Sequence, residues 1–250
     1  MLMALDWPLP QRVYAHSFWI SEGQKMSKSM GNFIDLEKIN HYVQTFGLDA
    51  LRYFLATAGP MGTTDSDFAE SRFIEVYNAD LANTLGNCFS RVTKMIGRYF
   101  DGHVPKPGPE VHADTEYDHA AESAIAKLKT AFDQLQLDHA AAAGMELVRL
   151  TDTYIEKTQP YKLAKDPDRI GEVGTILYNC AEAIRIVSLA LWPFMPSKMQ
   201  QLWERLGCAH YAQALANRGT GQLDAWMQWG QIEPGTPLQQ GDPLFPRYQA

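Results

Sequence analysis

The residues best placed to do chemistry are two lysines in the stretch GQKMSKSMGN, which covers residues 23–32. Lys25 and Lys28 stand three residues apart in a loop that is bounded by Gly23 and Gly31. Glycines at both borders give such a loop the backbone freedom to move. Two ammonium groups on a moving loop could close over a triphosphate and stabilise the charge that develops as pyrophosphate leaves. The composition is equally that of an ordinary Lys/Ser loop, so both interpretations stand at this point.

A second polar group falls on one face of a predicted long helix. It is an axial row of one amide and three cations, at i, i+4, i+7 and i+11: Asn87, Arg91, Lys94 and Arg98. In a chain with 22 Lys+Arg against 29 Asp+Glu, this row is a local positive stripe. Guanidinium and ammonium groups meet phosphates, and Asn and Arg also hydrogen-bond to base edges. Solvated helix faces are commonly polar too, so the row alone does not separate nucleic-acid contact from simple exposure.

An aromatic ring is expected near the end of another helix. Tyr161 directly follows Pro160 and is flanked by Lys162 and Lys165. Such a ring is most often a packing residue. Beside a cationic row, it is also a suitable platform on which an unpaired base could stack.

The first elements along the chain are predicted to be one strand and two short helices. The segment RVYAHSFWIS, residues 12–21, is β-branched and aromatic, which is typical of a strand. One strand is not a fold, so it would belong to a sheet that this chain cannot complete. The two helices open on Asp35 and Asp49 as caps and close on Gly47 and Gly59.

A long amphipathic helix is predicted next. Asp67 and Glu70 stand in the i, i+3 relation of a capping box, and the helical pattern continues to about Phe100. At 100° per residue, its buried face consists of Leu81, Leu85, Phe89, Val92, Met95, Ile96 and Tyr99.

The rest of the chain predicts more helices and then a tail. Two helices lie between residues 116 and 157, separated near LQLDHAA, where Asp138 is a candidate cap, and Pro160 stops the second. A further helix up to Trp192 has one apolar stripe, made of Ile176, Leu177, Cys180, Ile184, Val187 and Leu191. A short helix runs from Ser197 to Gly207.

The predicted fold class is therefore mainly α, with a bundle of four or five helices preceded by a small α/β piece. We expect three parts, covering residues 1–66, 67–207 and 208–250. The last part is rich in proline and glycine, which disfavours regular structure. It should nevertheless pack back on the bundle as an extended segment, because it carries the apolar residues Leu238, Leu244 and Phe245.

Composition excludes several classes of protein. The 250 residues are 46% hydrophobic with a formal charge of -7, which is typical of an ordinary globular protein. Three widely spaced cysteines give neither a disulfide framework nor the spacing of a zinc knuckle, so no metal site is expected. The start of the chain does not resemble a signal peptide, and the apolar stretch IVSLALWPFM is too short and proline-broken to span a bilayer. A cytoplasmic protein with no membrane contact is expected.

The stretch KMSKS is identical to the signature of class I aminoacyl-tRNA synthetases. Its neighbourhood, KMSKSMGNFIDLEKI, GLDALRYFLA, DSDF and YNADLANTLGNCFSR, closely resembles the methionyl-tRNA synthetase family, and so does the terminal PGTPL with DPLFPR. The resemblance covers nearly the whole chain and is weakest between residues 101 and 135. It implies that residues 1–66 are the end of a Rossmann catalytic domain with the loop and a stem-contact connector, and that residues 67–207 are a helical anticodon-binding domain.

The resemblance also implies roles for individual residues. Lys28 would contact the phosphates in the transition state of methionyl-adenylate formation, and Lys25 would support ATP and the loop. The implied ATP-binding set is Lys25, Met26, Ser27, Lys28 and Ser29. Asn87 and Arg91 match the positions that read the CAU anticodon of tRNA(Met). The implied substrates are methionine and ATP with Mg²⁺, both bound through an N-terminal half.

Two positions depart from the family pattern. Tyr161 stands where the family usually has a tryptophan that stacks on the anticodon, and a tyrosine ring offers less area. Ser17 follows His16 where the family commonly has glycine.

Several family features have no counterpart in this sequence. The HIGH-type motif, the methionine pocket and the zinc knuckle are missing, so we expect a C-terminal portion that does not make methionyl-adenylate alone. One alternative is the corresponding part of a leucyl, valyl, isoleucyl or cysteinyl enzyme. Another is a tRNA-binding module without catalytic duty, and a third is a helical scaffold with accidental basic residues.

Overall fold

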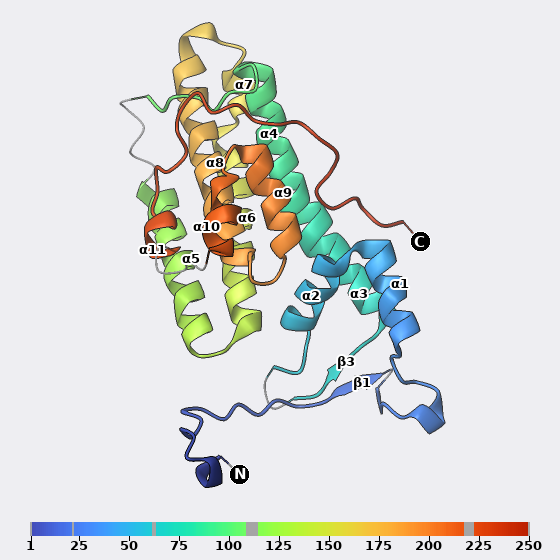
Figure 1. Ribbon diagram of the computed structural model, residues 1–250. Coiled ribbons are helices and arrows are strands. Elements are labelled where there is room, and N and C mark those ends of the chain that lie inside the picture. Colours follow the sequence, from blue (N-terminus) through green and yellow to red (C-terminus); the bar gives the residue numbers. More distant parts are fainter. Residues whose placement is uncertain (1, 22, 62–63, 109–114, 218–222, 250) are drawn as a thin grey trace.

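Helices dominate the protein, and a small N-terminal module lies at one end of a tall helical bundle (Figure 1). The computed structural model describes residues 2–21, 23–61, 64–108, 115–217 and 223–249. The predicted fold class, mainly α with a short α/β piece, is confirmed.

The N-terminal module contains a three-stranded sheet. Its strands, in the order β2-β1-β3, are β1 (Trp19–Ser21), β2 (Gln24–Lys25) and β3 (Ser66–Asp67). Strand β1 pairs antiparallel with β2 and parallel with β3. The strand expected over residues 12–21 therefore forms only in its last three residues. Before it come a 3-10 turn, η1 (Met3–Leu5), and an extended stretch in which Val13 is 90% exposed and Phe18 75%.

Two short helices, α1 (Leu36–Phe46) and α2 (Leu48–Thr57), pack beside the sheet. The predicted cap of α1 is confirmed, because Asp35 accepts a hydrogen bond from the backbone N–H of Lys38 at 2.9 Å. The predicted cap of α2 is wrong, since Gly47 occupies that position. The buried Asp49 instead accepts from the backbone N–H of Lys198 at 2.5 Å. It caps the start of a distant helix and so ties α2 to the bundle.

The predicted long helix exists, but its middle part is a π-helix and not an α-helix. It consists of α3 (Glu70–Val76), the π-helix η3 (Tyr77–Gly86) and α4 (Asn87–Tyr99). The predicted capping box is wrong, because Asp67 lies in β3 and accepts from the backbone N–H of Gly23 at 2.9 Å. The predicted apolar face is buried except at Tyr99, which is half-buried.

The bundle follows, with two helices that are joined at a tight turn. These are α5 (Thr115–Asp133) and α6 (Leu137–Thr158), as predicted from residues 116–157. Asp138 does not cap α6 but lies in its first turn, with Gln136 at the cap position. The remaining elements are α7 (Pro160–Leu163), the 3-10 turn η4 (Pro167–Arg169), α8 (Ile170–Leu191), α9 (Pro196–Leu206), α10 (His210–Ala216) and α11 (Leu223–Trp226).

Helix α8 is the centre of the bundle. Every residue from Val173 to Leu191 is buried, so the single apolar stripe that we predicted was too narrow. With the turn before it, the helix spans 25 residues, and an 18-residue window within it has a mean hydropathy of 1.3, which by length and composition is enough for a bilayer. The whole of this apolar window is buried inside the protein, as in the core helix of a bundle. The apolar stretch IVSLALWPFM is the C-terminal part of this longer helix together with the residues that follow it.

Helix α8 also carries a buried ion pair. Glu182 and Arg185 are both 0% exposed, with Oε2 and Nη2 2.8 Å apart. Arg185 donates to the backbone carbonyls of Trp226 and Gln228, and Glu182 accepts from the backbone N–H of Ile232 at 2.6 Å. The pair therefore fastens the end of the chain to the core.

The tail is partly helical, in contrast to our prediction, because α10 and α11 lie within it. Beyond Trp229 it is extended and crosses the bundle back to the N-terminal module (Figure 1). Leu244 and Phe245 are buried as expected. A hydrogen bond attaches this part of the tail to the long helix: the Tyr77 hydroxyl donates to the backbone carbonyl of Pro246 at 2.8 Å.

All three cysteines are buried and unpaired. Burial raises the pKa of Cys208 to about 11, so its thiol is neutral at pH 8. We expect Cys88, Cys180 and Cys208 to react with a thiol reagent at that pH only after denaturant unfolds the protein, because a thiolate is the reactive form. Counting labelled sites by mass spectrometry with and without urea checks this, and rapid labelling of the folded chain would contradict it.

Candidate functional site

The lysine loop is a closed turn on the surface of the N-terminal module. It contains strand β2 and a 3-10 turn, η2 (Lys28–Met30), and is bordered by Gly23 and Gly31, whose φ angles are 72° and 71°. Both glycines adopt a backbone conformation that other residues rarely take. Lys25 and Lys28 are exposed, so both ammonium groups can reach a ligand in solution.

The loop is held by hydrogen bonds to its own residues. The hydroxyls of Ser27 and Ser29 lie 2.8 Å apart, and the side chain of Asn32 bonds to the backbone of Ser27 at 2.9 Å. The Lys28 ammonium lies 5.7 Å from the centroid of the Phe33 ring, a cation–π contact. Lys28 and Phe33 line an open groove of about 670 Å³. Of the predicted ATP-binding residues, Lys28 thus lines a hollow in the surface.

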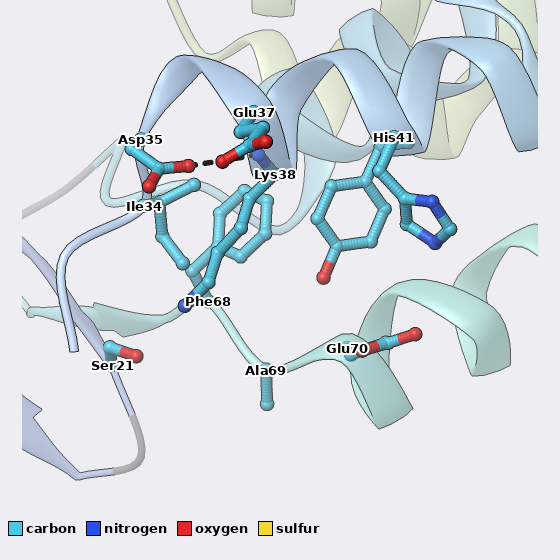
Figure 2. A pocket seen from close by; sticks show the side chains of 10 residues that line it. Ser21, Ile34, Asp35, Glu37, Lys38, His41, Phe68, Ala69 and Glu70 are labelled. Carbon is cyan, nitrogen blue, oxygen red and sulfur yellow. Dashed lines mark hydrogen bonds between the residues drawn. The ribbon is translucent and has the colours of Figure 1, made fainter. Parts of the chain in front are cut away.

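A second hollow, of about 400 Å³, lies between the sheet, α1 and the start of α3. Figure 2 shows Lys38 and His41 projecting from α1, with Glu70 on the facing helix. Lys25 and Lys28 do not line it. The two hollows adjoin each other, because Ile34, Asp35 and Glu37 line both.

The predicted cationic row lies on α4, but acids from a neighbouring helix face one member. Arg91 pairs with Glu156, and its Nη1 lies 3.7 Å from Oδ1 of Asp152. Both carboxylates come from α6, where they stand at i and i+4 on one face. Burial raises the pKa of Asp152, and the positive charge of Arg91 opposes that shift. The predicted row contains no acid of its own, but two acids of α6 hold the guanidinium of Arg91 in place.

The other two predicted binding residues lie on α4 and α7. Asn87 is exposed one turn before Arg91 on α4. Tyr161 is half-buried in α7, which follows α6 directly, and the chain turns there because Gln159 has a φ of 48°. Asn87 and Arg91 lie in the first two turns of α4, whereas α7 lies beside the C-terminal end of that helix (Figure 1). Arg91 pairs with Glu156, near the end of α6, and α7 follows that end directly. The structure therefore places Arg91 near the junction of α6 and α7, with Asn87 one turn before it on α4.

Two protein-family models match the chain. The model described as tRNA synthetases class I (M) covers residues 1–93, and the anticodon-binding domain of tRNA ligase covers residues 114–227. The methionine–tRNA ligase of Caldanaerobacter subterraneus subsp. tengcongensis is 39% identical over 99% of this chain, and that of Bacillus subtilis is 37% identical over all of it. The chain belongs to the methionyl-tRNA synthetase family. It spans 37% and 36% of the lengths of these two relatives.

A solved structure of this family has the same fold. Methionyl-tRNA synthetase from Mycobacterium tuberculosis, in complex with methionyl-adenylate, gives a TM-score of 0.83 at 31% identity. The match covers 98% of this chain and 46% of that one. These comparisons give no support to the leucyl, valyl, isoleucyl or cysteinyl alternatives.

In this member of the methionyl-tRNA synthetase family, the two groups of candidate residues lie far apart. The lysine loop is near the N-terminal end of the molecule, and α7 is at the opposite end of the bundle (Figure 1). Between the two groups, polar contacts at one carboxylate link α2, η3 and α6. The Tyr53 hydroxyl donates to Asp80 at 3.0 Å, and Arg149 pairs with the same carboxylate at 3.3 Å. A ligand that reached both groups would have to extend along the protein.

Sequence reasoning missed four residues at these sites. Asn32 and Phe33 lie three and four residues after the end of KMSKS, and Asp152 and Glu156 face Arg91. The i, i+4 spacing of Asp152 and Glu156 could have shown from the sequence that they share one helical face. Their partner Arg91 could not have been found in this way, because the pairing depends on how α4 and α6 pack.

Proposed function

We propose that this chain is the C-terminal part of a methionine–tRNA ligase, which attaches methionine to tRNA(Met) at the expense of ATP. The observation that carries the proposal is the KMSKS loop and the Asn87–Arg91–Tyr161 group on one chain with the fold of this family. The proposed organisation is residues 1–66 for the catalytic end and connector, 67–207 for anticodon binding and 208–250 for the tail. The proposed location is the cytoplasm.

The proposed chemistry at the loop belongs to Lys25 and Lys28. Their ammonium groups meet the phosphates of ATP, assisted by Met26, Ser27 and Ser29, as the negative charge shifts toward pyrophosphate. ATP enters with Mg²⁺ as a substrate of the complete enzyme, together with methionine. No group of three or more metal-ligating side chains occurs among the described residues.

The proposed chemistry at the other end is recognition of the CAU anticodon. Arg91 offers a guanidinium fork that its two carboxylates orient, and Asn87 offers an amide that can donate to and accept from a base edge. Tyr161 supports a stacked base.

We expect the Arg91→Ala variant to bind tRNA(Met) more weakly by about 1 to 3 kcal/mol, as for the loss of a bidentate base contact. Filter binding or fluorescence titration with transcripts that carry a CAU or an unrelated anticodon measures this. Lys127→Ala is the matched control, because Lys127 also pairs across helices, with Glu146, but lies on α5 and not on α4 or α7. Equal binding of all anticodons by the unaltered chain would remove the assignment.

Catalytic participation is tested by mixing the chain with a separately made N-terminal half of a homologous enzyme. Methionine-dependent ATP–pyrophosphate exchange above that of the N-terminal half alone supports the ligase. No gain would favour the alternative of a tRNA-binding module without catalytic duty. Retained tRNA binding in the same preparation would separate that module from a helical scaffold.

A further inference from the structure

One side chain joins the two sides of the lysine loop. Oδ1 of Asn32 accepts from the backbone N–H of Ser27 at 2.9 Å, and its Nδ2 donates to the backbone carbonyl of Lys25 at 3.2 Å. The two bonded residues flank Met26, so a single half-buried amide closes the first part of the KMSKS motif into a ring.

The rest of the loop is shaped to bring Asn32 back to that position. The 3-10 turn after Ser27 is closed by the backbone N–H of Met30, which donates to the Ser27 carbonyl at 3.2 Å. Gly31 then reverses the chain at a φ of 71°. The consequence is that Lys25 and Lys28 project from a loop whose backbone is fixed on both sides.

On this geometry, and resting on the proposed function, we propose that Asn32 is a positioning residue for Lys25 and Lys28. It does not touch ATP. It fixes the backbone from which the two ammonium groups project, so that the loop backbone need not reorganise when charge develops on the phosphates. Without this amide the loop still carries both lysines, but the backbone that presents them is no longer held.

An asparagine in a turn often bonds to its neighbouring backbone for stability alone. The two roles differ in what they change. A purely structural cap alters the stability of the loop or of the fold, whereas a positioning residue alters the rate of the chemical step at saturating substrate.

The first experiment uses the chain itself, with Asn32→Ala and Asn32→Gln. Glutamine keeps the amide but is one methylene too long for both bonds. We expect the backbone amide of Ser27 to exchange with solvent about tenfold faster in both variants, since it loses its acceptor. Asn40→Ala, at an exposed position of α1, is the matched control and should leave this rate unchanged. An unchanged Ser27 rate in the Asn32 variants would overturn the proposal.

The second experiment measures methionine-dependent ATP–pyrophosphate exchange after mixing with the N-terminal half. We expect kcat to fall about tenfold to a hundredfold in both Asn32 variants, as for misplaced catalytic groups, with KM for methionine unchanged. An unchanged kcat would overturn the positioning role even if the Ser27 amide is exposed. If the unaltered chain gives no exchange, the proposed ligase function fails and the catalytic role of Asn32 fails with it, while the Ser27 rate still reports whether Asn32 holds the loop.

Discussion

Replacing Arg185 by methionine is expected to destabilise the protein by about 3–5 kcal/mol, because it leaves the buried carboxylate of Glu182 without its counter-charge. The pair is 0% exposed on both sides. The variant also removes the donors to the carbonyls of Trp226 and Gln228, which lie in the returning part of the chain. Urea unfolding followed by circular dichroism measures the free energy of unfolding.

The chain supplies a matched control for this prediction. Arg169 and Glu172 form another i, i+3 pair at the start of α8, with a similar distance of 2.7 Å. Their side chains are 47% and 40% exposed, so water screens the pair. Arg169→Met should therefore change the free energy of unfolding by no more than about 1 kcal/mol. Equal losses in the two variants would show that burial does not set the strength of the pair.

Replacing Phe245 by alanine is expected to cost about 3–5 kcal/mol of folding stability, the usual range for a buried phenylalanine. Phe245 is 2% exposed, and its ring packs edge-on against that of Tyr77, with 6.4 Å between the ring centroids. The Lys198 ammonium lies 5.5 Å from the centroid of the Phe245 ring. Loss of the ring opens a cavity where the tail meets the π-helix η3. The same urea experiment measures the loss.

Phe18→Ala is the control for that variant, because Phe18 is 75% exposed. A surface substitution of this kind should stay within about 0.5 kcal/mol. If Phe245→Ala were as mild, the tail would be a loosely attached segment and not part of the core.

Local patterns in the sequence predicted most of the helices. The apolar spacing from Leu81 to Ile96 marked a buried face, and Asp35 marked the start of α1. Both signals lie within one turn or a few turns of the element that they describe. The family was predicted from the resemblance of KMSKS and its neighbouring residues to methionyl-tRNA synthetases, because helical periodicity alone does not identify a family.

Features that depend on distant partners were not predictable. The strands β2 and β3 have two residues each and exist only because they pair with β1. Asp49 looked like the cap of its own helix, yet its partner is the backbone of Lys198. Glu182 and Arg185 have the spacing of a solvated surface pair, and only the returning tail shows that they are buried.

At the candidate sites, the residue types were predictable but their restraints were not. Arg91 was found as a cation on a helix face, whereas its two carboxylates come from α6. Asn32 was within the quoted loop, but its bonds depend on the reversal of the chain at Gly31. Such restraints arise from tertiary packing and turn geometry, which a periodicity does not encode.

The returning tail has a consequence for the order in which the protein folds. The hydroxyl of Tyr77 and the carbonyl of Pro246 are separated by 169 residues of sequence. Asn78 and Tyr248, 170 residues apart, exchange two more bonds. During synthesis, the segment around Tyr77 therefore leaves the ribosome well before its partners in the tail. Closing so long a loop is slow, and until it closes the apolar surface around Tyr77 stays open to solvent and to aggregation.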